Sequence, residues 1–198
     1  DVYNPALIML ANLRALFGVF VDIMFLRRGP EQLPASRMLL AIIGIVHVVV
    51  HSIAVHVFLA PFRPGQGSAV PSQVLATVFM MVWFQFALRL AGKPERFVQT
   101  MIAVFFVSLL SVLMYPLLAA MLPYAIAAQE SPTTATPAPG SLVLLAAIMT
   151  FWIIAMLARV VKSAFEWSWP ATILFVLMSA FGVPLLLGLI FSGVSKAA

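Results

Sequence analysis

The chain has 198 residues, of which 64% are apolar and only 9% are charged, and its mean hydropathy is +1.12. A soluble domain carries about 25% charged residues, so this composition excludes a water-soluble fold and a disordered tail protein. The chain has no cysteine, which excludes disulfides, cysteine zinc sites, iron–sulfur clusters and thiol nucleophiles. The net charge of +5 is spread over separate connections, so it does not form the basic face that nucleic acid requires. We therefore predict an all-α integral membrane protein.

Residues 1–38 are predicted to form an N-terminal amphipathic segment followed by a cytoplasmic loop. Within this segment, residues 5–26 are apolar enough to span a membrane, but Arg14, Gly18 and Asp22 share one stripe of the helix. An Arg or Asp at a helix centre costs about 2.5 to 3.5 kcal/mol, which nearly cancels the gain from the apolar residues. We favour an interfacial helix on the cytoplasmic side; the alternative is a further, sixth span.

Residues 39–198 are predicted to form the helical transmembrane domain. A span needs about 20 apolar residues, and five stretches without internal charge meet this need: 39–60, 72–88, 97–122, 142–157 and 170–191. Backbone groups in lipid must bond within their own segment, so each stretch is predicted to be a helix. Pro116 and Pro184 each lack a backbone donor, so we expect a kink near each. The stretches 62–71 and 124–141 are predicted to be irregular loops on the outer side.

The connections between these stretches differ in their content of Lys and Arg. Starting with the connection before the first span, the successive connections hold three, one, three, none, two and one Lys or Arg residues. The positive-inside rule places the richer set in the cytoplasm and the C-terminus on the non-cytoplasmic side. These residues would either set the topology alone or also form a collar for anionic headgroups or an acidic partner. The candidate contact residues are Arg27, Arg28, Arg37, Arg89, Lys93, Arg96, Arg159 and Lys162.

His47 and His51 are four residues apart in the stretch 39–60, so both rings project from one helix face. His56 lies about 180° away around the helix and cannot join them. Neutral imidazole is a common axial ligand of haem and a metal ligand, so His47 and His51 are candidates for binding a haem or pigment. The other interpretation is that they hydrogen-bond across the bundle or line a wet crevice. No other span carries a histidine.

All six acidic residues lie in connections or in the N-terminal helix. Spans without carboxylates argue against an ion-coupled transporter or a proton pump. No nucleophile, base and orienting acid can be combined, so we predict no enzyme, no catalytic site and no metal site, and no cofactor beyond the haem or pigment alternative. Stripes of small residues predict close packing inside the bundle in preference to oligomerisation: Pro184, Gly188 and Ser192, and Ala87 with Ala91.

Several short motifs accompany this layout. They are Gly92-Lys93 followed by Phe97, Gln99 and Thr100; Tyr115-Pro116; Trp152 followed by Lys162-Ser163-Ala164; and Asp1-Val2-Tyr3-Asn4-Pro5. Over roughly residues 27–193 the chain resembles the Yip1 family of five-span membrane proteins, and its bacterial branch most closely. The first five residues are similar to the Asp-Leu-Tyr-Gly-Pro motif of the eukaryotic members of this family. The resemblance implies a cytoplasmic N-terminus, an inner-membrane location and a non-enzymatic role in organising membranes or as an adaptor for other membrane proteins.

Three functions therefore stand as hypotheses. The first is a Yip1-like membrane-organising or adaptor protein that acts through lipid or protein contacts. The second is an accessory subunit of a larger energy-transducing membrane complex, in which His47 and His51 would ligate a haem or pigment. The third is a carrier of a small solute or a lipid.

Overall fold

A computed structural model describes residues 5–62, 69–131 and 136–182, and these residues form helices without any strand. The main helices are α1 (Pro5–Met24), α2 (Arg37–Ala54), α3 (Ala69–Leu90), α4 (Phe97–Ser111), α5 (Met114–Glu130), α6 (Gly140–Phe165) and α7 (Trp169–Leu177). Short 3-10 or π-helical segments join or extend them: η1 (Pro30–Gln32), η2 (Val55–Leu59), η3 (Ala60–Phe62), η4 (Pro94–Arg96) and η5 (Met178–Gly182). The predicted all-α class is thereby confirmed.

Among the residues that the structure describes, three helices are long and apolar enough to cross a membrane. They cover Arg37–Phe62, Val70–Leu90 and Gly140–Phe165, and a fourth crossing is possible if α4 and α5 act as one bent span. The last predicted span begins as the shorter apolar helix Trp169–Phe181, and its remaining residues lie outside the described part of the chain. Helices that could span a membrane are therefore present, while the count of five stays a prediction.

Three helices are longer than the sequence predicted. The helix α6 runs eight residues past the predicted end of its span, through Arg159 and Lys162, and α5 continues to Glu130. Residues 124–130 are therefore helical, which corrects the loop predicted for 124–141. Likewise α3 begins at Ala69, inside the loop predicted for 62–71. Charge ended the predicted span at residue 157, and loop-like composition gave the predicted loops 62–71 and 124–141. A helix has no reason to stop where lipid gives way to the interface, and Ala-rich segments favour helix.

A break separates α4 from α5, and their axes differ by 46°. Pro116, the third residue of α5, has no backbone N–H to offer Val112 O, which instead accepts from Tyr115 N at 3.1 Å. The preceding amides of Val112 and Leu113 also bond three residues back, so the chain tightens just before the proline. The kink predicted at Pro116 is confirmed. The kink predicted at Pro184 lies outside the described residues.

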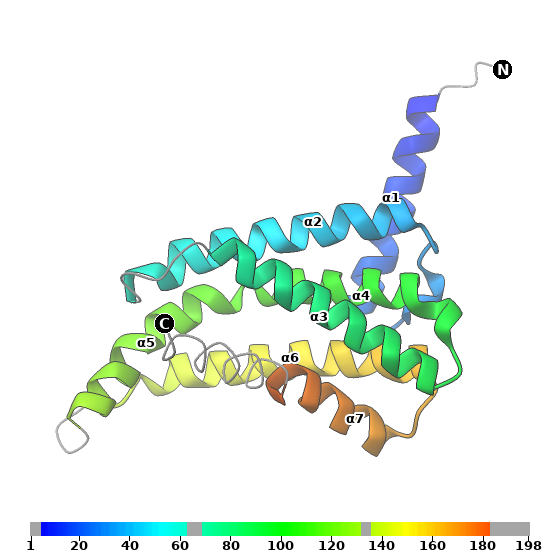
Figure 1. The fold of residues 1–198 in the computed structure, drawn as a ribbon. Coiled ribbons are helices and arrows are strands. Elements are labelled where there is room, and N and C mark those ends of the chain that lie inside the picture. The colour runs from blue at the N-terminus through cyan, green and yellow to red at the C-terminus, as the bar shows by residue number, and fades with distance from the viewer. Residues whose placement is uncertain (1–4, 63–68, 132–135, 183–198) are drawn as a thin grey trace.

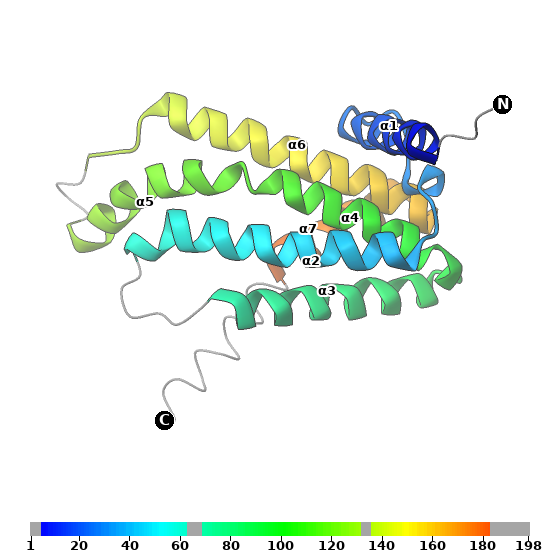
Figure 2. The ribbon, with the colours of Figure 1, turned by 90° about the horizontal axis from the view of Figure 1, so that it is seen from above.

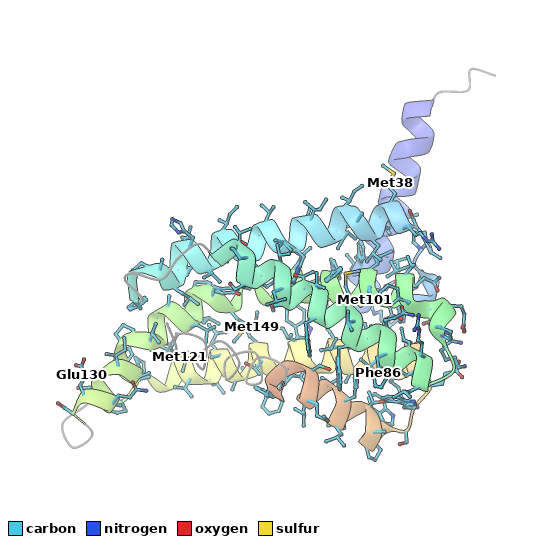
Figure 3. All side chains as sticks on the ribbon, viewed as in Figure 1. Met38, Phe86, Met101, Met121, Glu130 and Met149 are labelled. Carbon is cyan, nitrogen blue, oxygen red and sulfur yellow. The ribbon has the colours of Figure 1, made fainter. Side chains whose placement is uncertain are left out.

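The helix α4 forms the centre of the bundle and packs against α2 and α6. Its residues from Thr100 to Val107 are buried except for Phe106, as expected for a helix that is covered all round. Figure 3 shows Met101 inside the bundle, whereas Met38 on α2 and Phe86 on α3 point outward. The outward side chains are 75% and 55% exposed. Such large exposed apolar side chains suit contact with lipid.

The helix α2 shows how the outer and inner faces differ. Its exposed residues include Ile42, Ile45 and Val49, whereas its buried face carries His47 and His51. A soluble helix would bury its apolar stripe and expose its polar one. This helix does the reverse, because the polar groups find their hydrogen-bond partners only inside the bundle.

The helix α1 crosses the axis that α2, α3, α4 and α6 share, as the two views show (Figure 1, Figure 2). Its C-terminal part packs on α4 and α6 near one end of the bundle. The rings of Phe20 and Phe106 stack with centroids 4.2 Å apart, and Trp152 Nε1 donates to Met24 O at 3.2 Å. These contacts hold α1 across the bundle instead of alongside it.

Candidate functional site

The three connections that are richest in Lys and Arg meet at one end of the bundle, which we call the basic end. They join α1 to α2, α3 to α4 and α6 to α7, and Figure 1 shows all three at the same end. Glu130, at the end of α5, lies at the opposite end (Figure 3). The predicted alternation of basic and non-basic connections therefore corresponds to two chemically different ends of the folded chain.

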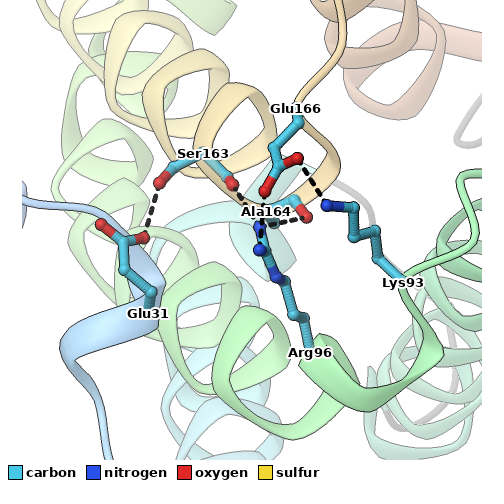
Figure 4. A network of polar contacts seen from close by, with 6 residues as sticks. All are labelled: Glu31, Lys93, Arg96, Ser163, Ala164 and Glu166. Atoms are coloured by element: carbon cyan, nitrogen blue, oxygen red, sulfur yellow. Dashed lines mark hydrogen bonds and ion pairs between the residues drawn. The ribbon is translucent and has the colours of Figure 1, made fainter.

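A polar network ties the three connections together (Figure 4). Arg96 donates to Ser163 O at 3.0 Å, to Ala164 O at 3.3 Å and to Glu166 Oε1 at 2.6 Å. These contacts place the guanidinium over the C-terminal carbonyls of α6, where a positive charge is favoured. Lys93 Nζ donates to the other oxygen of Glu166 at 2.5 Å. One carboxylate thus joins both basic residues of the α3–α4 connection to the end of α6.

The α1–α2 connection joins the same network. Ser163 Oγ donates to Glu31 Oε2 at 2.5 Å, and Gln99 Nε2 donates to Leu33 O at 2.7 Å. Leu33 itself is buried. The α1–α2 connection is therefore fixed against both α6 and the first turn of α4.

Glu166 ends α6 in the left-handed conformation, with φ of 56°. Hydrogen bonds from Lys93 and then Arg96 lower the pKa of its carboxyl below the ordinary value. Because the Glu166 side chain is 54% exposed, its ion pairs are screened and their main effect is to orient the connections.

The eight candidate contact residues fall into two groups. Arg28 pairs with Asp22 at 2.8 Å, Lys162 donates to Trp167 O, and Lys93 and Arg96 belong to the polar network. The other four take part in none of the ion pairs that the structure shows among its described residues: Arg27, Arg37, Arg89 and Arg159.

Two of these four cations have distinctive surroundings. Arg27 lies over the ring of Phe25, 5.5 Å from its centroid. Arg159 buries its Nε without a hydrogen-bond partner among the described residues. A charged donor that is left unsatisfied in this way is costly, and because this nitrogen is buried, an anion from outside the chain does not reach it in this conformation.

A second polar cluster surrounds His47 and His51 in the middle of the bundle, where their rings are 4.4 Å apart. Ser108 Oγ lies 2.9 Å from His47 Nε2, and Thr77 Oγ1 lies 3.3 Å from His47 Nδ1. His51 Nε2 donates to Ser108 O at 3.0 Å, and its Nδ1 lies 3.2 Å from the hydroxyl of Tyr115. The hydrogen bonds across the bundle are thus present, on partners from α3, α4 and α5.

The acceptors in this cluster fix the direction of each bond. The Ser108 carbonyl can only accept, so His51 carries its proton on Nε2 and accepts at Nδ1 from the Tyr115 hydroxyl. Thr77 donates to Gln73 O at 2.7 Å, so it accepts from His47 Nδ1. His47 Nε2 then accepts from the Ser108 hydroxyl. Two neutral imidazoles satisfy every polar group in this chain of bonds.

The hydrogen bonds of His47 and His51 determine whether these histidines could bind a haem iron or another metal. A histidine binds iron or another metal through a nitrogen lone pair, and here those lone pairs, on His47 Nε2 and His51 Nδ1, accept hydrogen bonds. Axial ligation would require either nitrogen to leave its partner. Within the described residues, no group of three or more His, Cys, Asp or Glu side chains could hold a metal ion. His56 is exposed, on the opposite face as predicted.

Sequence reasoning missed the residues that complete both clusters. Thr77, Ser108 and Tyr115 are isolated polar residues in apolar helices, and this is the signal that could have identified them. Glu31 and Glu166 were seen only as loop charges. Their roles depend on which connections meet, and that follows from the fold. Ala87 is buried, consistent with packing inside the bundle, whereas Pro184, Gly188 and Ser192 lie outside the described residues.

No protein-family model, curated protein or solved structure matches this chain.

Proposed function

We propose that this protein is a non-enzymatic, Yip1-like membrane protein that organises membranes or serves as an adaptor through contacts made by its basic end. The observation that carries the proposal is the meeting of three basic connections at that end, with Arg27 and Arg89 left out of every ion pair among the described residues. Anionic headgroups or an acidic partner would satisfy them, since each basic residue near an anionic leaflet contributes about 1 kcal/mol.

We further propose that the basic end faces the cytoplasm of a bacterial inner membrane. The positive-inside rule supports this orientation, and the crosswise α1 supports an interfacial helix in preference to a sixth span. With five crossings, the C-terminus would lie on the non-cytoplasmic side.

The test compares two double variants that remove the same amount of charge. Arg27→Gln with Arg89→Gln acts on the basic end, and Arg63→Gln with Lys196→Gln acts on connections predicted to lie outside. After crosslinking in native membranes and purification in mild detergent, we expect the first pair to lose copurified partners and anionic lipids several-fold. The second pair should retain them. Equal retention by both variants would refute a role for the basic end.

The haem or pigment alternative has a separate test. A Soret or chlorophyll band in the purified protein, lost in His47→Ala and His51→Ala, would establish it. The occupied lone pairs of both rings support the opposite outcome, a spectrum with protein absorption alone. Substrate-dependent uptake into proteoliposomes would favour the third hypothesis, a carrier.

A further inference from the structure

A groove of about 450 Å³ runs along the outer surface between α2 and α3, within the size range of small-molecule sites. Its walls include Ala41 and Val48 of α2 and Val74 and Val78 of α3, and Phe105 of α4 also lines it. Gly44 helps to open it, because a Cβ at that position would contact the Phe105 ring at 3.5 Å. The groove therefore follows from a missing side chain on one helix and valines on the other.

The groove has few polar groups, and they differ in whether they already have partners within the chain. Thr77 lines it, but its hydroxyl is already bonded to Gln73 O and His47 Nδ1. Arg37 also lines the groove; it is exposed and belongs to none of the ion pairs found among the described residues. An occupant would thus need one anionic group at Arg37 and an apolar body elsewhere.

The length of the groove matches half of a bilayer. Its lining on α2 runs from Arg37 to Val49, which is about 18 Å at 1.5 Å per residue. The hydrocarbon core of a membrane is about 30 Å thick, so one leaflet contributes about 15 Å. Arg37 lies at the basic end, where headgroups would be, and the deep end lies near the histidine cluster.

We propose that this groove binds an anionic glycerophospholipid, with one acyl chain between α2 and α3 and the phosphate on the Arg37 guanidinium. Arg is well suited to this role because its planar donors match phosphate oxygens in pairs. The inference rests on the proposed function, since it takes the basic end to lie at a membrane surface. It goes beyond that function by naming a lipid class and a single site.

The test uses the purified, delipidated full chain in mild detergent, titrated with dioleoylphosphatidylglycerol or dioleoylphosphatidylcholine. Native mass spectrometry counts the bound lipids, and the melting temperature gives a second measurement. Arg37→Gln removes the charge and Val78→Trp fills the groove. Their matched controls are Arg63→Gln, an arginine in a connection predicted to lie on the outer side, and Val82→Trp, an exposed valine one turn along α3.

We expect one phosphatidylglycerol per chain, bound in preference to phosphatidylcholine and raising the melting temperature. Arg37→Gln should weaken it about fivefold, and Val78→Trp should abolish it, while both controls bind normally. Equal binding of the two lipids, or equal loss in a control, would overturn the proposal. So would a change of oligomeric mass in Val78→Trp without loss of lipid, because a second copy would then fill the groove. This test needs no partner protein, so its result is independent of the basic-end experiment.

Discussion

The histidine cluster shows how polar residues are accommodated inside an apolar bundle. His47 and His51 each use both ring nitrogens, and Ser108 serves both rings through its hydroxyl and its carbonyl. Such bonds between transmembrane helices are worth about 0.6 kcal/mol on average and seldom exceed 1.7. Their larger effect is on specificity, because an alternative register of α2 on α4 would leave imidazoles unpaired.

Ser108→Ala removes the hydroxyl that donates to His47. We expect the free energy of unfolding to fall by about 1 kcal/mol, because a buried acceptor loses its partner. Reversible unfolding in mixed detergent micelles measures this. The control is Ser111→Ala, whose hydroxyl donates to Ser108 O at 2.6 Å, a carbonyl that still accepts from His51. A loss as large in the control as in Ser108→Ala would contradict the assigned role.

Glu166 predicts a pH dependence at the basic end. Its pKa is lowered in the folded chain, so its contribution to stability is complete above the unfolded pKa of about 4.3 and is lost as the pH falls through the folded pKa. Glu166→Gln should therefore lower the melting temperature at pH 7, and its difference from the parent should shrink toward pH 3. The matched control is Glu95→Gln, at an exposed carboxylate outside the polar network, and an equal loss of melting temperature at pH 7 in this control would contradict the role of Glu166.

At the scale of elements, the bent pair α4 and α5 shows what the sequence could and could not predict. Pro116 predicted the kink, because a proline lacks the backbone N–H that would bond to the carbonyl four residues earlier, and this loss bends any apolar helix. The end of α5 was missed because its Ala- and Pro-containing sequence is also typical of a loop. The end of α6 was harder to predict, because charge marks the edge of lipid and not the end of a helix. The continuation of α6 through Arg159 and Lys162 was missed for this reason.

Pro116→Ala should straighten the pair, because the new amide could bond to Val112 O. With α4 and α5 about 22 and 25 Å long, loss of the 46° bend lengthens their end-to-end distance by about 4 Å. Spin labels on Glu95→Cys and Gln129→Cys, in a chain without native cysteine, report this distance by pulsed electron spin resonance. Pro123→Ala, at the proline inside α5, should leave the distance between the labels unchanged. An equal lengthening in Pro123→Ala would refute Pro116 as the cause of the bend.

At the scale of the whole molecule, the folded chain separates its charges toward one end. The sequence predicted this through the alternation of Lys and Arg, because the bilayer acts on each connection separately. It did not predict which charges would be used internally. The pairing of Lys93 and Arg96 with Glu166 depends on the α3–α4 turn meeting the end of α6. Only the packed bundle brings those positions together, and the same holds for Ser108 and the histidines.

Single cysteines test the orientation of the two ends. Glu95→Cys, in the α3–α4 connection, and Thr136→Cys, between α5 and α6, should react with a membrane-impermeant maleimide from opposite sides of the membrane. We expect Glu95→Cys to react only after the cells are opened and Thr136→Cys to react from outside. If both positions were accessible from the same compartment, the alternation of the spans would be wrong.

The polar network has a consequence for how the protein is made. Ser163 and Glu31 are 132 positions apart, and Glu166 and Lys93 are 73 apart. During synthesis, the α1–α2 and α3–α4 connections therefore lack these partners until α6 has left the ribosome. A nascent chain arrested before residue 163 would therefore carry open hydrogen-bonding groups on its α1–α2 and α3–α4 connections, and quality-control proteases would remove it faster than the finished protein.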